Sequence, residues 1–224
     1  MQALDHNAYL AMREGAQVLE ADHFGEKVLR LRNGNFLKLF RRKRLLTSAA
    51  LLPYAQRFAN NSLALQQRGI PCPEVLAVYR IKSIQRDAVY YAPLEGKTLR
   101  ELVDHPEREV SLQAQLGEFV AQLHACGVYF RALHLGNIVL TKENTMGLID
   151  IDDLQCSKRP LGRGKRKRNF HHLFRYAQDL KFLQPQASHF TTGYCRDLNF
   201  NQQALFTHYL NGLISKARLP ATGQ

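Results

Sequence analysis

The chain changes character at Pro93-Leu94-Glu95-Gly96, a turn-like segment near the middle of its 224 residues. Short strand-like runs dominate before this segment, and apolar residues with helical spacing dominate after it. This order predicts an α+β fold in which a small antiparallel sheet with one main helix is followed by a mostly helical second lobe. Because ligand pockets favour the seam between lobes, we expect a cleft near residues 92–96.

The first lobe is rich in β-prone segments. Such runs predict strands at residues 16–20, 27–31, 36–40, 75–79 and 88–91. Asn33-Gly34 lies between the second and third of these runs and tolerates the positive φ angles of a tight hairpin turn. The sequence therefore predicts a small antiparallel sheet.

A helix is predicted at residues 49–67, where apolar residues recur near a period of 3.6 and Gly69 follows to end it. Pro53 is expected in the first turn of this helix or at a kink. Beyond the central turn, spacing predicts helices at 98–103, at 112–126 and from about 169 onward, and short strands at 138–140 and 147–149.

The composition, 45% hydrophobic and 22% charged, is that of a globular protein and excludes a disordered chain. No stretch approaches the roughly 18 consecutive apolar residues of a membrane span. Residues 1–19 lack the basic start and apolar run of a signal peptide. We therefore expect a cytoplasmic protein.

Residues 124–153, HACGVYFRALHLGNIVLTKENTMGLIDIDD, carry most of the chemical information. The pattern predicts a polar loop up to Asn137, a strand, and a second strand that ends in Asp150. An amide oxygen and a carboxylate at neighbouring strand ends are expected to face one site. Hard oxygen ligands of this kind suit Mg²⁺, which takes its other ligands from water and from a nucleotide's phosphates.

Five motifs follow one another along the chain: Lys38 in NFLKLF, then GIPCPEV, PLEGKTL, LHACGVYFRALHLGN and LIDIDD. Their order resembles that of the protein-kinase-like superfamily, most closely the bacterial Kdo/WaaP lipopolysaccharide core kinases and the toluene tolerance proteins. The resemblance implies a two-lobed kinase-like fold with an N-lobe at residues 1–91, a hinge at 92–97 and a trimmed C-lobe at 98–224.

The resemblance also implies a nucleotide site with ATP and Mg²⁺ as cofactors. Lys38 would hold the α- and β-phosphates, Asn137 and Asp150 would hold the metal, and backbone groups from Ala92 through Leu94 to Glu95 would contact the adenine. The turn at residues 23–27 would cover the phosphates, although it contains a single glycine, Gly25, and no GxGxxG motif.

Departures from the kinase pattern concern the catalytic groups. Five residues before Asn137, where kinases place a catalytic aspartate, the sequence has Ala132. Asp150-Ile151-Asp152 replaces the DFG motif. His134 and Asp152 are candidate replacement bases, with His134 preferred because its usual pKa near 6.5 suits a base at neutral pH. The alternatives are a structural, hydrogen-bonded His134 and an Asp152 that, with Asp153, caps the following segment.

The first helix departs from the pattern as well. The sequence has no Asp or Glu between residues 41 and 73, so this helix cannot supply the glutamate that usually pairs with the strand lysine. Gln56, Asn60 or Asn61 could offer a neutral partner. An alternative is that Lys38, which lies between Leu37 and Leu39, points into solvent from an alternating strand.

The net charge of +12 is concentrated in two runs. Eleven cations, with no acid among them, lie at Arg41, Arg42, Lys43 and Arg44 and at Lys158, Arg159, Arg163, Lys165, Arg166, Lys167 and Arg168. The second run follows Asp150 closely and borders the expected acceptor site. We expect Arg131, Arg163, Lys165, Arg166 and Arg168 to bind an anionic acceptor.

Three functions remain open at this stage. The first is an ATP-dependent phosphotransferase acting on a lipopolysaccharide core sugar or another anionic small-molecule or glycolipid acceptor, with peripheral contact to the inner membrane face. The second is a pseudokinase scaffold, since the position of the catalytic aspartate is Ala132. The third is nucleic-acid binding through the basic run, although Lys/Arg runs alone identify partners poorly, so no specific nucleic acid is expected.

Overall fold

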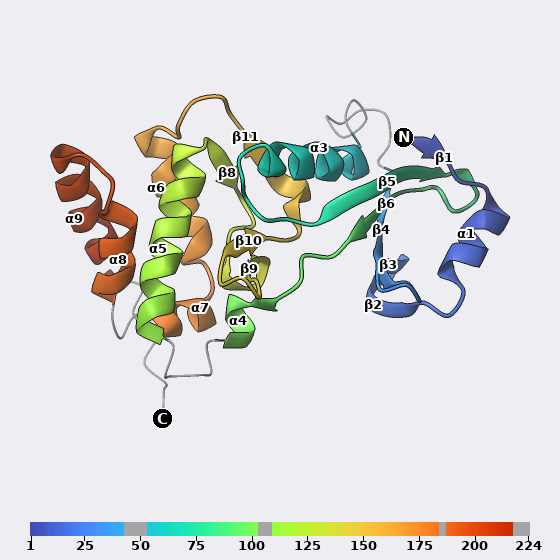
Figure 1. Ribbon diagram of the computed structural model, residues 1–224, viewed down its shortest axis with the longest axis horizontal. Coiled ribbons are helices and arrows are strands. Elements are labelled where there is room, and N and C mark those ends of the chain that lie inside the picture. Colours follow the sequence, from blue (N-terminus) through green and yellow to red (C-terminus); the bar gives the residue numbers. More distant parts are fainter. Residues whose placement is uncertain (43–52, 103–108, 184–186, 217–224) are drawn as a thin grey trace. The chain divides into compact units, whose positions relative to one another are not determined.

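The computed structural model describes residues 1–42, 53–102, 109–183 and 187–216 of the chain. It divides into two compact units (Figure 1). The first unit comprises residues 1–95 and 147–153, and the second comprises residues 96–146 and 154–224. The return of residues 147–153 to the first unit is no part of the division predicted from the sequence.

The first unit is built on a six-stranded sheet. Its order is β1-β5-β6-β4-β3-β2, where β1 pairs with β5 in parallel and the other neighbours are antiparallel. The elements are β1 Gln2–Ala3, α1 His6–Arg13, β2 Gln17–Asp22, β3 Gly25–Arg30, β4 Phe36–Arg41, α3 Tyr54–Gln66, β5 Glu74–Ile81 and β6 Arg86–Ala92.

The predicted antiparallel sheet is confirmed. β3 and β4 pair in antiparallel register around the Asn33-Gly34 turn, where Gly34 has a φ of 85°. The turn closes through a 2.9 Å hydrogen bond from Gly34 N to Leu31 O. β1 and α1 were not predicted. Asp5 marks the start of α1, where its side chain accepts a 2.8 Å hydrogen bond from Ala8 N.

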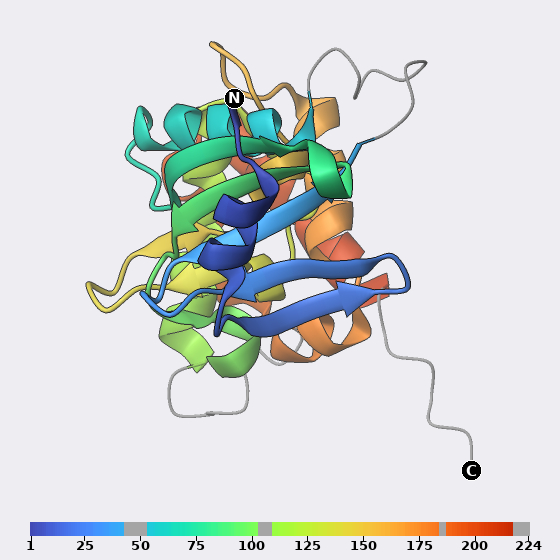
Figure 2. The same ribbon diagram turned by 90° about the vertical axis from the view of Figure 1, so that its right-hand side faces the viewer.

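The two faces of β4 have different environments. Leu37 and Leu39 are buried in a cluster with Tyr9 of α1, and Figure 2 shows α1 crossing this face of the sheet. Because side chains alternate along a strand, Lys38 and Phe40 point to the opposite face. Helix α3 packs on that face, where Phe58 lies beside Tyr91 with 5.2 Å between the ring centroids.

Helix α3 is shorter than the helix predicted at 49–67. Its described part begins after Pro53, which is its N-terminal cap and does not kink it. Residues 49–52 of the predicted helix lie outside the described residues. The helix ends at Gln66, and Gly69 follows with a φ of 66°.

The second unit is mainly helical. Its elements, together with the strand at which the chain returns to the first unit, are β7 Lys97–Thr98, α4 Leu99–Leu102, α5 Glu109–Ala125, β8 Val128–Phe130, β9 Ile138–Leu140, β10 Met146–Leu148, β11 Leu154–Cys156, α6 Arg163–Leu173, α7 Ala177–Leu183, α8 Ala187–Cys195 and α9 Phe200–Lys216. The strands form small sheets of order β10-β9-β7 and β11-β8.

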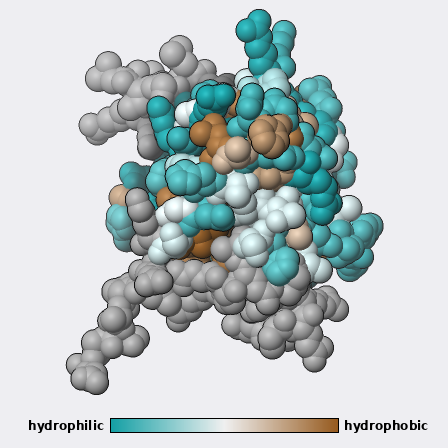
Figure 3. All heavy atoms as spheres, turned by 90° about the vertical axis from the view of Figure 1, so that its left-hand side faces the viewer, coloured by the Kyte–Doolittle hydropathy of each residue, from teal (hydrophilic) through white to brown (hydrophobic). Residues whose placement is uncertain are grey.

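Close contact between α5 and α8 organises this unit. A side chain at Gly117 would collide with the backbone of Phe190, and one at Gly193 would collide with Ala114. These glycines therefore let the two helix backbones approach. Figure 3 shows one face of the molecule, on which apolar patches lie among hydrophilic surface and surface of intermediate hydropathy.

Helix α6 begins at Arg163, earlier than the predicted start near residue 169. Residues 163–168, which the sequence analysis assigned to an acceptor-bordering segment without helix, therefore form the first turns of α6. Lys and Arg are good helix formers, and this propensity prevails here over the repulsion of like charges near a helix N-terminus. Within the described residues, no helix combines the length and apolar character needed to cross a membrane.

Candidate active site

Lys38 is the central side chain of the candidate site in the first unit. Its side chain is only 13% exposed, and its Nζ lies 5.3 Å and 5.8 Å from the ring centroids of Phe40 and Phe58. The solvent-facing alternative is therefore wrong. A buried ammonium group requires partners, because removing a charge from water without compensation is costly.

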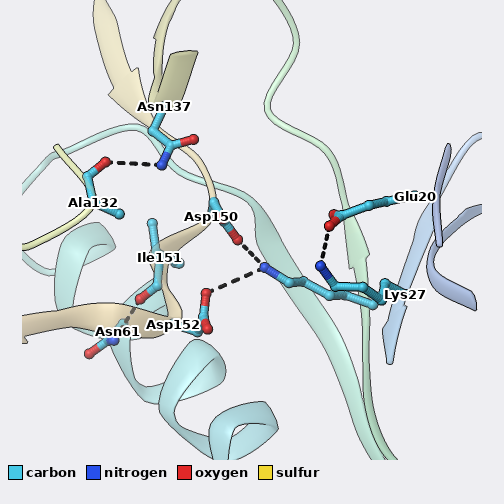
Figure 4. A network of polar contacts seen from close by, with 9 residues as sticks. Glu20, Lys27, Asn61, Ala132, Asn137, Asp150, Ile151 and Asp152 are labelled. Atoms are coloured by element: carbon cyan, nitrogen blue, oxygen red, sulfur yellow. Dashed lines mark hydrogen bonds and ion pairs between the residues drawn. The ribbon is translucent and has the colours of Figure 1, made fainter. Parts of the chain in front are cut away.

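Two carboxylates of the returning segment supply these partners. Lys38 Nζ donates a hydrogen bond to Asp150 Oδ1 and a second, of 3.3 Å, to Asp152 Oδ1 (Figure 4). Asp150 has a φ of 57°, a left-handed conformation that is uncommon outside glycine and often marks functional sites. The carboxylate of Asp150 is half exposed, whereas that of Asp152 is 21% exposed.

Burial and charge act in opposite directions on these groups. Burial favours the neutral form of Lys38, but the nearby charges of Asp152 and Asp150 outweigh it, so the pKa of Lys38 is raised. Burial also opposes ionisation of Asp150, yet Lys38 lowers the pKa of this carboxyl below its usual value. For Asp152, burial together with repulsion from Asp150 outweighs the attraction of Lys38 and raises the pKa.

Helix α3 supports the turn that carries these carboxylates. Asn61 Nδ2 donates a 2.7 Å hydrogen bond to the carbonyl of Ile151, whose side chain is fully buried (Figure 4). Gln56 and Asn60 hydrogen-bond to each other at 3.0 Å. Of the residues proposed as neutral partners of Lys38, Asn61 thus holds the Ile151–Asp153 turn, and Gln56 and Asn60 bind each other.

The turn between β2 and β3 is His23-Phe24, so the turn predicted at residues 23–27 is shorter in the structure. Gly25, the residue predicted to cover the phosphates, is the first residue of β3. Gly25 has a φ of 108°, which suits glycine. Asp22 Oδ1 accepts a 2.8 Å hydrogen bond from Phe24 N, and Arg86 donates a 2.6 Å hydrogen bond to Phe24 O. The guanidinium carbon of Arg41 lies 3.3 Å from the Phe24 ring centroid. These contacts hold the turn without a glycine-rich motif.

A pocket of about 220 Å³ lies beside this turn in the first unit. It is lined by Asp22, Lys27, Leu39, Phe40, Arg41, Tyr54, Arg86 and Asp152. Lys27 forms an ion pair with Glu20 (Figure 4). This volume is below the roughly 300–1,000 Å³ of typical ligand pockets. Lys27 falls at the end of the segment predicted to cover the phosphates, whereas Arg86 was not predicted, because it comes from a strand without a recognisable motif.

Asn137 and His134 lie in one loop of the second unit. Asn137 is 7% exposed, and its Nδ2 donates a 3.0 Å hydrogen bond to the carbonyl of Ala132, which directs the amide oxygen away from Ala132 (Figure 4). The His134 ring packs edge-on against Tyr176, with 5.2 Å between centroids. Ala132, at the position where the kinase pattern has an aspartate, thus contributes its backbone carbonyl to holding Asn137.

An ion pair that the sequence analysis did not identify anchors this loop. Asp179 of α7 is fully buried and accepts hydrogen bonds of 3.0 Å and 2.9 Å from Arg100 of α4. Asp179 also accepts a 3.1 Å hydrogen bond from Leu135 N. The signal in the sequence is a single acid in the apolar helix AQDLKFL, but its partners are distant in the chain.

The predicted adenine-contacting residues lie at the end of β6 and directly after it. Ala92 is the last residue of this strand and pairs with Glu74, Leu94 is partly buried and Glu95 is exposed. The second unit begins at Gly96, where φ is 147° and a side chain would collide with Leu140 O. This position therefore requires glycine.

The predicted acceptor-binding cations do not share one environment. Arg131, Arg163, Lys165 and Arg168 are exposed. Arg166 is buried, and its guanidinium donates hydrogen bonds of 2.8 Å to Leu161 O and 3.2 Å to Tyr194 OH. Burial removes Arg166 from the surface that an acceptor can reach. In the first basic run, Lys43 and Arg44 lie outside the described residues.

The chemistry of the donors fits Mg²⁺. Asp150 offers a half-exposed carboxylate and Asn137 an amide oxygen. Among the described residues, no three His, Cys, Asp or Glu side chains gather closely enough to hold a metal alone. A half-exposed carboxylate such as that of Asp150 suits a metal that takes its further ligands from water and phosphates. That Asn137 and Asp150 share one metal stays a prediction, because they belong to different units.

Comparisons with known proteins agree with the motifs. The sequence model of the lipopolysaccharide kinase (Kdo/WaaP) family matches residues 13–194. A solved structure of WaaP in complex with acyl carrier protein matches with a TM-score of 0.65 and 14% sequence identity, covering 94% of this chain and 93% of WaaP. No curated protein matches the chain. The structural match confirms the predicted α+β, kinase-like fold.

Proposed function

Because the chain belongs to the lipopolysaccharide kinase (Kdo/WaaP) family, we propose that it transfers the terminal phosphoryl group of ATP to a hydroxyl group of lipopolysaccharide core or a similar anionic glycolipid or sugar. The observation that carries this proposal is the buried Lys38, held by Asp150 and Asp152 on the sheet face covered by α3. A strand lysine beside a carboxylate that can bind Mg²⁺ is an arrangement that protein kinases use for phosphoryl transfer.

The nucleotide would be bound through four sets of groups. Lys38 would hold the α- and β-phosphates, and the turn at Gly25 would cover them. Backbone groups of Ala92, Leu94 and Glu95 would hold the adenine. Asn137 and Asp150 would hold Mg²⁺, which neutralises charge on the phosphates when bound.

His134 is the first candidate for the base that accepts the proton of the acceptor hydroxyl, and Asp152 is the second. A positioned base contributes roughly 10²–10⁴-fold to such reactions, whereas positioning and charge neutralisation contribute most of the rest. Alanine at position 132 is therefore compatible with a slow kinase. It is equally the feature that favours the rival function, a pseudokinase that binds nucleotide without transfer.

The exposed cations of α6 are proposed to bind the anionic acceptor. Arg163, Lys165 and Arg168 lie in its first turns, and Arg131 is exposed on the loop before His134. These charges would also favour peripheral contact with the anionic face of the inner membrane. An acyl carrier protein is a second candidate partner, since the similar WaaP was solved with one.

The test is phosphate transfer from radiolabelled ATP with Mg²⁺ to purified lipid A-core acceptor. Wild type should label the acceptor, and Asn137→Ala and Asp150→Ala should reduce labelling to background. Equal labelling in all three proteins would refute the enzymatic function. Nucleic-acid binding would instead appear as affinity for DNA or RNA that falls steeply with salt and ignores ATP.

The acceptor surface can be tested separately. A triple variant, Arg163→Glu with Lys165→Glu and Arg168→Glu, should raise KM for the acceptor and leave ATP affinity unchanged. The effect should shrink as salt increases, because exposed charges are screened. An unchanged acceptor KM would place the acceptor elsewhere.

A further inference from the structure

Lys38 has a counter-ion in an unexpected place. Helix α3, which spans Tyr54–Gln66 and covers the sheet face of Lys38, contains no Asp or Glu. Asp152 nevertheless lies 3.3 Å from Lys38 Nζ through its Oδ1. The carboxylate that accompanies the strand lysine therefore comes from the Ile151–Asp153 turn.

The environment of Lys38 makes a resident counter-ion necessary. Its side chain is 13% exposed and lies near the rings of Phe40 and Phe58, which cannot accept a strong hydrogen bond. Asp150 also contacts Lys38, but its carboxylate is half exposed and is the proposed metal ligand. Asp152 is the more enclosed of the two carboxylates, with 21% of its side chain exposed.

The turn that carries Asp152 is fixed from both sides. The buried Ile151 side chain anchors it in the unit, and Asn61 of α3 binds the Ile151 carbonyl at 2.7 Å. Figure 4 shows Asp150 and Asp152 on the same side of this turn, with the Asn61 contact at the carbonyl between them. Helix α3 thus acts on Lys38 through the turn.

We propose that Asp152 is a positioning residue: it is the resident counter-ion of Lys38, in the role that an acid on α3 would otherwise have, and Asn61 keeps its turn in place. Asp152 then orients the lysine for the nucleotide phosphates, and proton acceptance from the acceptor is left to His134. This inference rests on the proposed function, because it assigns Lys38 to phosphate binding.

The test compares Asp152→Asn and Asp152→Glu with Asp153→Asn, a neighbouring carboxylate outside the proposed site. ATP affinity is measured by calorimetry without acceptor, and kcat and KM are measured with it. Asp152→Asn should weaken ATP binding and raise KM for ATP by about 10–100-fold, as for other residues that orient a ligand-binding group. Asp152→Glu should restore part of the affinity, and Asp153→Asn should stay within about twofold of wild type.

Two results would overturn the proposal. A fall in kcat at unchanged ATP affinity would make Asp152 a base that acts in the chemical step. A lower melting temperature with unchanged ATP affinity and kcat would make its role purely structural.

The counter-ion relation can be tested even if wild type binds no ATP, in which case the proposed function fails on its own. In a double-mutant cycle on the unfolding equilibrium, Asp152→Asn should clearly destabilise the protein when Lys38 is present and should destabilise it much less in the Lys38→Met background. We expect a coupling of at least about threefold in the unfolding constant. Additive effects of the two substitutions would contradict a direct Lys38–Asp152 pairing.

Discussion

The stability of the second unit should depend on pH through one buried histidine. His124 of α5 is fully buried, with Nδ1 3.0 Å from Tyr194 OH and Nε2 3.1 Å from Asn169 Oδ1. Burial lowers its pKa from 6.5 to about 3, the hydrogen bond to Asn169 opposes this shift, and the charge of Arg166 adds to it. The histidine is therefore neutral in the folded protein.

The sign and size of the effect follow from this pKa. The unfolded chain takes up a proton on His124 below about pH 6.5, whereas the folded protein does so only near pH 3. The contribution is thus fully present above pH 6.5 and is lost as pH falls towards 3, by about 1.4 kcal/mol per pH unit. Between pH 7 and pH 5 the loss from His124 alone is about 2 kcal/mol.

Urea unfolding at pH 7 and pH 5 measures this loss. Because other ionisable groups also contribute to the pH dependence, the wild type is compared with His124→Gln, which keeps all of those groups. The drop in unfolding free energy from pH 7 to pH 5 should be larger in wild type by about 2 kcal/mol. An equal drop in both proteins, or an NMR signal of His124 that titrates near pH 6.5 in the folded state, would refute the reasoning.

Three further predictions concern the stability of the protein; two involve residues of the second unit and one involves a residue of the first unit. Gly117→Ala should destabilise the protein by about 1–3 kcal/mol, because the added methyl group meets the backbone of Phe190, whereas Gly212→Ala in α9 meets open space and should stabilise it by up to about 1 kcal/mol. Urea unfolding measures both changes, and changes of the same sign would contradict the packing of α5 against α8. Asp179→Ala should cost about 3 kcal/mol in the same assay because it leaves Arg100 without its buried carboxylate, and a loss below about 1 kcal/mol would mean that this pair does not anchor the loop. Asn61→Ala should cost about 1 kcal/mol by removing its bond to the turn, and should weaken ATP binding less than Asp152→Asn; a larger effect on ATP would reverse their assigned order.

Local patterns predicted the first unit well. The Asn33-Gly34 hairpin and the strands around it depend on turn chemistry and on alternation, which neighbouring residues determine. β1 depends instead on the pairing of Gln2 with Tyr79, which is distant in sequence, and a strand of two residues is too short to show a pattern of its own. The same holds for the three-residue strands β8 and β11.

The site shows a similar division. Motif order was sufficient to select Lys38, but only the packing of α1 against Leu37 shows which face of β4 the lysine occupies. The role of Asp179 in anchoring the loop could not be predicted, because its partner Leu135 lies 44 residues earlier in the sequence. Arg166 resembles its basic neighbours in sequence, and only the position of Tyr194 shows that it is buried.

The central claim is that Lys38 and its carboxylates form a nucleotide phosphate site, and calorimetric titration with ATP and Mg²⁺ tests it most directly. Wild type should bind, Lys38→Ala should bind at least about tenfold more weakly, and Lys82→Ala, which removes an exposed lysine of the same unit, should bind as wild type does. Equal affinity of wild type and Lys38→Ala, or no binding by wild type, would contradict the account.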